Sequence, residues 1–186
     1  MINNLKRFIS PRVKTSTFSC IRCGNCCKFS EIILSNREIR AISNQLHISI
    51  SEFTQQYLIK KEIHKIRSIF SDRFEIRGEV LVLKKNNQNL CPFYKKIDAK
   101  ATCDIYHFRP IVCRLYPFTW KTSAYDPQEM NVAIDFSQNG WDECLGINNQ
   151  GKSWDQLRDE ITGAVLLSII QSNELIADGF LTQIPK

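Results

Sequence analysis

Hydrophobic residues recur at helical spacing in three parts of the chain, and each part begins with a capping signal. Ser35-Asn-Arg-Glu38 has the form of a capping box, and Ser49-Ile-Ser-Glu52 and Ser153-Trp-Asp-Gln156 repeat its spacing. The third part has one apolar helical face, which consists of Trp154, Leu157, Ile161, Val165 and Ile169. The pattern predicts two short helices after Ser35 and Ser49 and another helix after Ser153.

Other segments alternate apolar and polar positions, as strands do. Residues 74–83 alternate around Arg77-Gly78 and precede a polar loop over 84–89, which predicts a small hairpin. Met130 to Phe136 alternate in the same way and predict a strand. Residues 90–120 are rich in Cys, Pro and aromatic residues without long periodicity. Such a composition is typical of a compact irregular segment that ligands hold together.

Length and composition favour one globular domain. A chain of 186 residues lies below the size at which domains usually split, and a hydrophobic content of 43% with eleven Phe supplies a core. This composition excludes global disorder. The longest apolar run, Ala164 to Ile170, is far shorter than the roughly twenty residues of a membrane-spanning helix. We therefore expect no membrane span.

Positive charge is concentrated in the first third of the chain. The formal net charge is +6, yet residues 1–67 carry twelve Lys or Arg against four Glu, while the remainder carries thirteen basic and fifteen acidic residues. A nucleic-acid interface is one interpretation, but the chain has no compact basic run and no nucleic-acid-binding motif. Thiolates bound to metal would offset part of the excess, because each ionised thiol adds a negative charge. Nucleic acid is therefore not the expected partner.

Eight cysteines are the most informative feature of the composition. The N-terminus has no apolar run long enough for export, so we expect a cytoplasmic protein, in which disulfides are rare. Clustered cysteines then indicate metal binding or thiol chemistry. The candidate metal ligands are Cys20, Cys23, Cys26, Cys27, Cys91, Cys103, Cys113 and Cys144. The first four form CxxCxxCC, where Gly24 can adopt a positive φ and let backbone amides approach the sulfurs.

The adjacent residues Cys26 and Cys27 limit how the ligands are shared. Neighbouring side chains diverge by about 100° in a helix and about 180° in a strand, so two of them rarely bind one small ion. One of the pair is expected to serve a second site or to remain a free thiol. Zinc sites and iron–sulfur clusters each take four cysteines, and eight cysteines make two such sets. The spacing alone does not separate zinc from a 4Fe-4S cluster.

Other interpretations of the cysteines are weaker. Buried structural thiols, or disulfides in an oxidising host, would account for them without metal. A thiol oxidoreductase would place CxxC where a strand leads into a helix of a βαβ unit, and no such strand is predicted before Phe18. A Cys3His site completed by His107 is a variant of metal ligation.

The second cysteine block carries a specific motif. Cys91-Pro-Phe-Tyr94 is followed by Cys103-Asp-Ile-Tyr106-His-Phe-Arg109-Pro110-Ile-Val-Cys113-Arg114-Leu-Tyr116-Pro117-Phe118. Together with FxCxxCGxCC at Phe18 to Cys27, this block resembles the YkgJ-type CxxCxxCC cysteine-cluster family, described as a zinc- or iron-chelating domain. The resemblance covers about residues 18–146. Small departures, at Ala101-Thr102 and Tyr94, do not affect a ligand.

The resemblance implies that the cysteines bind metal. It extends to Cys20, Cys23, Cys26, Cys27, Cys91, Cys103 and Cys113, and Cys144 resembles the trailing cysteine of the family. A related branch, the flagellin lysine N-methylases, has a similar block and is associated with an iron–sulfur cluster and methyl transfer. Those chains are much longer, and no glycine-rich methyl-donor site is present here, so we predict no particular enzymatic activity.

Three residues near the cysteines are expected to support the metal ligands. Arg109 should lie at a bend, because Pro110 disfavours a helical conformation in the residue before it. Its guanidinium is expected to pair with Asp104, and the alternatives are donation to sulfurs or binding of an anionic substrate. Arg114 is expected to offset the charge of the adjacent ligand. Tyr106 is expected to pack, with its hydroxyl bonded to backbone or to a sulfur.

These observations predict an α+β fold, a small single domain with short helices and a small antiparallel sheet around an irregular, Cys-ligated metal centre. Residues 1–17, basic and without periodicity, are expected to form an N-terminal arm, and residues 18–186 the cysteine-cluster domain. Two functions remain open. The first is a protein that chelates zinc or iron, in one form as an iron–sulfur cluster, through its cysteines. The second is a structural zinc module that binds a protein or nucleic acid without catalysis.

Overall fold

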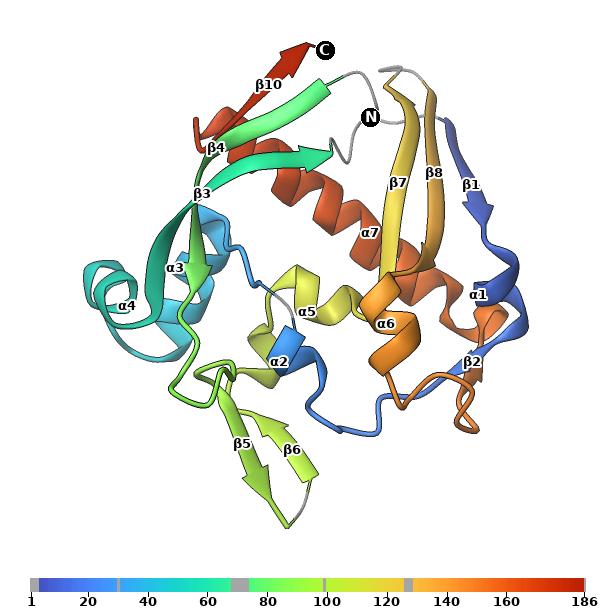
Figure 1. The fold of residues 1–186 in the computed structure, drawn as a ribbon, viewed down its shortest axis with the longest axis horizontal. Helices are drawn as coiled ribbons and strands as arrows, with labels where there is room; N and C mark the ends of the chain where they lie inside the picture. Colours follow the sequence, from blue (N-terminus) through green and yellow to red (C-terminus); the bar gives the residue numbers. More distant parts are fainter. Residues whose placement is uncertain (1–3, 30, 68–73, 99, 126–128, 186) are drawn as a thin grey trace.

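A long C-terminal helix, α7 (Trp154–Ala177), spans the molecule from one three-stranded sheet to another (Figure 1). The computed structural model describes residues 4–29, 31–67, 74–98, 100–125 and 129–185. The helices are α1 (Pro11–Thr15), α2 (Cys26–Phe29), α3 (Asn36–Gln45), α4 (Ile50–Tyr57), the 3-10 helix η1 (Tyr106–Phe108), α5 (Ile111–Leu115), α6 (Gln138–Glu143) and α7 (Trp154–Ala177).

Two larger sheets and two short ribbons form the β structure. The strands are β1 (Asn4–Ile9), β2 (Thr17–Phe18), β3 (Leu58–Arg67), β4 (Phe74–Leu83), β5 (Tyr94–Ile97), β6 (Lys100–Cys103), β7 (Phe118–Tyr125), β8 (Glu129–Phe136), β9 (Lys152–Ser153) and β10 (Leu181–Pro185). The three-stranded sheets have the orders β1-β8-β7 and β10-β4-β3, and β2-β9 and β5-β6 are two-stranded. The α+β class is confirmed. The predicted single small sheet is replaced by several, and one pair, β1 with β8, is parallel.

The predicted helices begin at their predicted caps. Ser35 Oγ accepts a hydrogen bond from the Glu38 N–H at 3.4 Å, and a Glu38 carboxylate oxygen accepts one from the Ser35 N–H at 3.0 Å. The Ser49 hydroxyl caps α4. At the start of α7, the Gln156 side chain accepts from the Ser153 N–H at 2.9 Å. The predicted apolar face of α7 is buried, so its periodicity did indicate core packing.

The hairpin predicted within residues 74–83 is wrong, because this segment is one continuous strand. β4 pairs with β3 on one side and with β10 on the other. Gly78, which suggested a turn, lies inside the strand, opposite Ile63 of β3 and Leu181 of β10. The β3 register shifts just after Ile63, and glycine inside a strand is typical of such irregular places.

The segments predicted to lack regular structure also contain it. Before Phe18 the chain forms β1 and α1, and Val13 of α1 is only 2% exposed. Residues 1–3 of the predicted arm lie outside the described residues. Between residues 90 and 120 the chain forms the β5-β6 ribbon, η1, α5 and the first part of β7. The predicted strand over 130–136 is confirmed as β8.

The core has two parts, which β4 joins. Val80 and Val82 pack in a first core with residues of α7 and of the β1-β8-β7 sheet, whereas Leu83 belongs to a second core. Successive strand residues face opposite sides, which explains how one strand serves both cores. The second core consists of Ile32, Leu34, Ile39, Ile42, Phe53, Leu58, Leu83, Cys91, Phe93 and Ile105. A cysteine is thus part of this core.

Within the described ranges, no helix is both long enough and apolar enough to cross a membrane.

Candidate metal centre

The CxxCxxCC segment folds as a tight turn that leads into α2. The Cys27 N–H donates to the Gly24 carbonyl at 3.0 Å, and Gly24 has a φ of 79°. A Cβ atom on Gly24 would lie 2.6 Å from Cε2 of Tyr94 and 3.0 Å from Cβ of Ala101. Glycine is therefore required here both by the backbone conformation and by the close approach of the β5-β6 ribbon.

Backbone hydrogen bonds place the second cysteine block against this turn. The Cys91 N–H donates to the Cys27 carbonyl at 3.1 Å. Cys103 ends strand β6 opposite Tyr94, whose own N–H donates to the Cys91 carbonyl at 3.0 Å. The short helix α5 carries Cys113. Cys27 and Cys91, which are 64 positions apart in the sequence, are thus joined by a direct main-chain contact.

The last cysteine reaches the same turn from the other side. Cys144 directly follows α6, and the side-chain amide of Asn25 donates to the Glu143 carbonyl at 2.8 Å. The Ser19 N–H donates to the Gly146 carbonyl at 3.0 Å. These two contacts hold the loop around Cys144 alongside the residues that carry Cys20 and Cys23.

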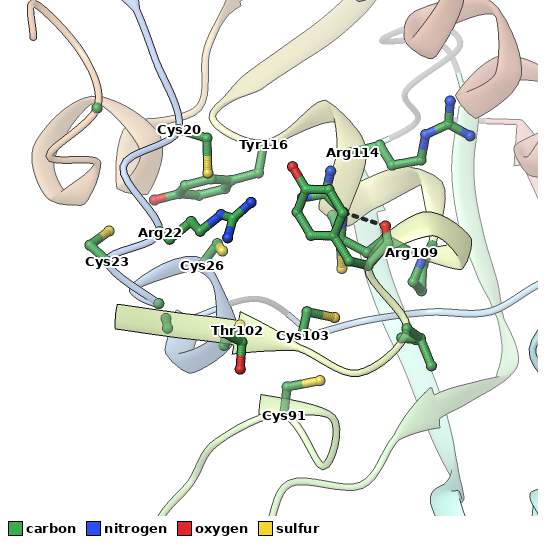
Figure 2. Close-up of a pocket in the computed structure, with 18 of the residues that line it drawn as sticks. Cys20, Arg22, Cys23, Cys26, Cys91, Thr102, Cys103, Arg109, Arg114 and Tyr116 are labelled. Carbon is green, nitrogen blue, oxygen red and sulfur yellow. Dashed lines mark hydrogen bonds between the residues drawn. The ribbon is translucent and has the colours of Figure 1, made fainter. Parts of the chain in front are cut away.

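All eight predicted ligands line one cavity of about 350 Å³ (Figure 2). They belong to the described residues, and all are free thiols, with Cys20 exposed and Cys91 buried. Within the described residues no three Cys, His, Asp or Glu side chains already form a set that could hold a metal ion. The thiols surround the cavity without converging on one point, so ligation requires their side chains to turn inward.

The thiols of Cys26 and Cys27 share one hydrogen bond. This bond lowers the pKa of Cys26 to about 7; burial opposes the effect and the Arg109 guanidinium assists it. The same bond, together with burial, raises the pKa of Cys27. Cys26 therefore loses its proton first, and Cys27 holds the remaining proton strongly.

Burial raises the pKa of four other thiols in the cavity, namely Cys91, Cys103, Cys113 and Cys144. Neighbouring sulfurs add to the effect. Cys91, Cys26 and Cys103 act on Cys113, whereas Cys23 and Cys20 act on Cys144. A cation inside the cavity would remove this penalty, because ionised thiolates repel one another until a positive charge lies between them.

Arg109 contacts Tyr106 instead of the predicted Asp104. Its guanidinium carbon lies 3.9 Å from the Tyr106 ring centroid, and its Nε donates to the Tyr106 carbonyl at 3.0 Å. Asp104 is paired with Lys95 at 2.8 Å. The predicted bend is confirmed, because Arg109 has an extended ψ of 138° just before Pro110. The positive charge lowers the pKa of Cys26, Cys103 and Cys113, although burial outweighs it at Cys103 and Cys113.

Arg22 joins Arg109 at the Tyr106 ring. Its guanidinium carbon lies 5.6 Å from the ring centroid, and its φ of 55° is unusual for a residue other than glycine. Its carbonyl accepts a hydrogen bond from Ala101 of β6 at 2.9 Å. Tyr106 is thus a platform on which two cations are placed over the cavity.

Three further residues that line the cavity differ in where their side chains lie. Arg114 is exposed, and Figure 2 shows its guanidinium directed away from the labelled cysteines. His107 lines the cavity but is exposed, with its ring edge-on to Tyr106. The Tyr116 hydroxyl donates to the Asn139 carbonyl at 3.2 Å.

Two residues of the site were missed from the sequence. Lys85 donates from Nζ to the Cys27 carbonyl at 2.8 Å, and its charge lowers the pKa of Cys91 against the larger, opposing effect of burial. Asn25 makes the contact with Glu143 described above. Lys85 lies in a polar loop without a motif. Its contact with Cys27 depends on the tertiary fold, which the local sequence does not indicate. Asn25 was inside the motif, where its position between Gly24 and Cys26 was the available signal.

The structure defines a small α+β protein whose cysteines gather from distant segments around one cavity. The chain belongs to the CxxCxxCC family, whose description is "Putative zinc- or iron-chelating domain" and whose model matches residues 19–139. Seven of the eight cysteines lie in the matched range, and Cys144 lies beyond it.

One curated relative is similar to this chain. The uncharacterized protein MJ0661 of Methanocaldococcus jannaschii is 24% identical over 102 residues, which make up 55% of this chain and 45% of that protein. The chain thus matches less than half the length of that relative. No solved structure matches this chain.

Proposed function

We propose that the chain is a metal-binding protein that holds zinc or iron, in the latter case as an iron–sulfur cluster, through the thiols of the cavity. The observation that carries the proposal is the presence of all eight cysteines on one cavity, although they come from three regions of the sequence. Thiolates are the preferred ligands of zinc and of iron–sulfur clusters. Eight free thiols also fit a reducing compartment, so we place the protein in the cytoplasm.

Residues of the chain prepare the cavity for a metal ion. Arg109 and Arg22 lie over the cavity on the Tyr106 ring, and Arg109 favours ionised sulfurs. The charge of Lys85 likewise favours the ionised thiol, in this case at Cys91. A bound iron–sulfur cluster would supply electron transfer, and a bound zinc ion would supply a Lewis acid or a structural cross-link.

A structural zinc module is the second candidate. It is favoured by the packing of Cys27, Cys103 and Cys113 against the second core, of which Cys91 is a member. Structural zinc is enclosed by four ligands and contributes directly to folding. In contrast, the exposed Cys20 at the edge of the cavity favours a metal centre that solutes can reach.

Metal and acid-labile sulfide content per chain, measured on protein purified without oxygen, tests the proposal. Iron with an equal amount of sulfide and a brown colour would identify a cluster, and zinc without sulfide or colour would identify a zinc protein. Cys113→Ser should lower the metal content and the melting temperature together, because Cys113 both lines the cavity and packs against the second core. A chain that takes up neither zinc nor iron with sulfide after reduction would refute the proposal.

A further inference from the structure

We propose that the eight cysteines form two separate four-thiolate metal sites, an inner site of Cys27, Cys91, Cys103 and Cys113 and an outer site of Cys20, Cys23, Cys26 and Cys144. The inference rests on the proposed function and specifies its site. Each set supplies the four ligands that a zinc ion or an iron–sulfur cluster takes from cysteine.

The inner set is defined by its packing. Cys91 belongs to the second hydrophobic core, and Cys27, Cys103 and Cys113 are the other cysteines packed against it. Main-chain contacts keep three of them together, since the Cys91 N–H bonds to the Cys27 carbonyl and Cys103 lies across from Tyr94. α5 brings in the fourth, and its first N–H, at Ile111, is anchored to the Glu38 carboxylate of α3. An apolar wall thus backs the inner set.

The outer set is defined by contacts at the opposite end of the cavity. Asn25, which directly precedes Cys26, donates to the Glu143 carbonyl beside Cys144. Ser19, which precedes Cys20, bonds to the carbonyl of Gly146. Figure 2 shows Cys20 and Cys23 on the side of Arg22 and Tyr116, apart from Cys91 and Cys103, with Cys26 between the two groups. None of the outer four packs against either core among the described residues.

The division also explains the adjacent cysteines. Both residues of the pair lie in α2, where successive side chains diverge by about 100°. Cys27 packs against the second core, and Cys26 does not belong to that cluster. A single site would require both sulfurs to point toward one ion. With two sites, each of the diverging sulfurs can bind a different ion.

The two sites should differ in exchange. The inner metal would be enclosed by Phe93, Ile105 and their neighbours, and would exchange slowly. The outer metal would face solvent beside Cys20, which is exposed, and would exchange quickly with chelators. The inner site therefore supports the fold, and the outer site is the one available for function.

Zinc titration of the reduced, metal-free full chain tests this division. Native mass spectrometry should find two zinc ions per chain. At one equivalent of zinc, alkylation followed by peptide mapping should find protection of one complete set of four cysteines and modification of the other. This readout uses the unaltered chain, so it does not depend on whether a variant folds.

Substitutions give the matched comparison. Cys144→Ser should bind one zinc and keep Cys27, Cys91, Cys103 and Cys113 protected, and Cys103→Ser should leave the outer four protected. Protection that mixes the sets, for example Cys23 with Cys113, or loss of both ions from Cys144→Ser, would overturn the division. One ion per unaltered chain would also overturn it while leaving metal binding intact. Absence of any zinc or iron binding would instead refute the proposed function.

Discussion

The carboxylate of Glu38 accepts a hydrogen bond from the backbone N–H of Ile111 at 2.8 Å, so a residue of α3 caps the start of α5. The other carboxylate oxygen closes the capping box with Ser35 and accepts from Gln171 of α7. One side chain therefore joins three helices, and α5 presents Cys113 to the cavity. The burial of the carboxylate raises its pKa, although these hydrogen bonds oppose the rise.

Glu38→Gln should destabilise the protein by about 1–3 kcal/mol, because a buried group loses an acceptor and the new amide faces N–H donors. Urea unfolding followed by circular dichroism measures the change. Glu31→Gln is the matched control, since Glu31 is exposed and pairs only at the surface with Lys61. It should stay within about 0.5 kcal/mol of the parent chain. Equal losses in the two variants would show that Glu38 has no special structural role.

Gly24→Ala should weaken metal binding and destabilise the turn. Alanine is disfavoured at a φ of 79°, and its methyl group would meet the Tyr94 ring. Gly163→Ala is the control, because a Cβ there meets no atom within 4 Å and the residue lies inside α7. That change should stabilise the protein by about 0.5–1 kcal/mol. Thermal melting and zinc titration of both variants check the prediction, which fails if Gly24→Ala retains the parent zinc affinity.

The metal-free protein should lose stability at high pH. Burial raises the pKa of Cys91, Cys103, Cys113 and Cys144 above the ordinary thiol value of 9.0, so the folded chain keeps these protons when the unfolded chain has released them. The stabilisation is therefore complete below pH 9 and declines as the pH rises through the folded-state values.

Metal reverses this dependence. Because the bound sulfurs are deprotonated, metal binding releases protons and the loaded form should weaken as the pH falls. Melting temperatures between pH 5 and pH 10, with and without zinc, measure both trends. Parallel curves for the two forms would contradict the assignment of these thiols as ligands.

Arg109→Gln should make Cys26 less reactive. The hydrogen bond from Cys27 is the largest cause of the low pKa of Cys26, and the Arg109 charge contributes to it. Loss of that charge should shift the pH midpoint of Cys26 alkylation upward in the metal-free protein, as followed by peptide mapping. Arg114→Gln removes the same charge from an exposed side chain directed away from the labelled sulfurs. An equal shift in both variants would show that only the net charge matters.

Local signals were sufficient for α3, α4 and α7 and for the strand β8. Ser35, Ser49 and Ser153 mark helix starts because capping depends on residues three positions apart. β3 was missed, since Leu58–Arg67 is rich in Lys and does not alternate cleanly, and its partner β4 lies beyond residue 73. β1 was missed for a similar reason, because its pairing with β8 joins residues more than a hundred positions apart.

The site was predictable in its members but not in its arrangement. The motifs identified all eight cysteines that line the cavity. Arg109 was expected to pair with Asp104, yet Lys95 of β5 pairs with that carboxylate. The packing of Cys27, and not of Cys26, against the second core depends on segments that lie far apart in sequence.

The contact between Asn25 and Glu143 also orders the assembly of the protein in time. A ribosome releases the CxxCxxCC segment long before Cys91, Cys113 or Cys144 has been made. In the proposed division the inner set is complete once Cys113 has emerged, whereas the outer set waits for the loop that follows α6 to emerge and bond to Asn25. Until that point Cys20, Cys23 and Cys26 are without their fourth ligand, and the growing chain depends on the reducing power of its surroundings.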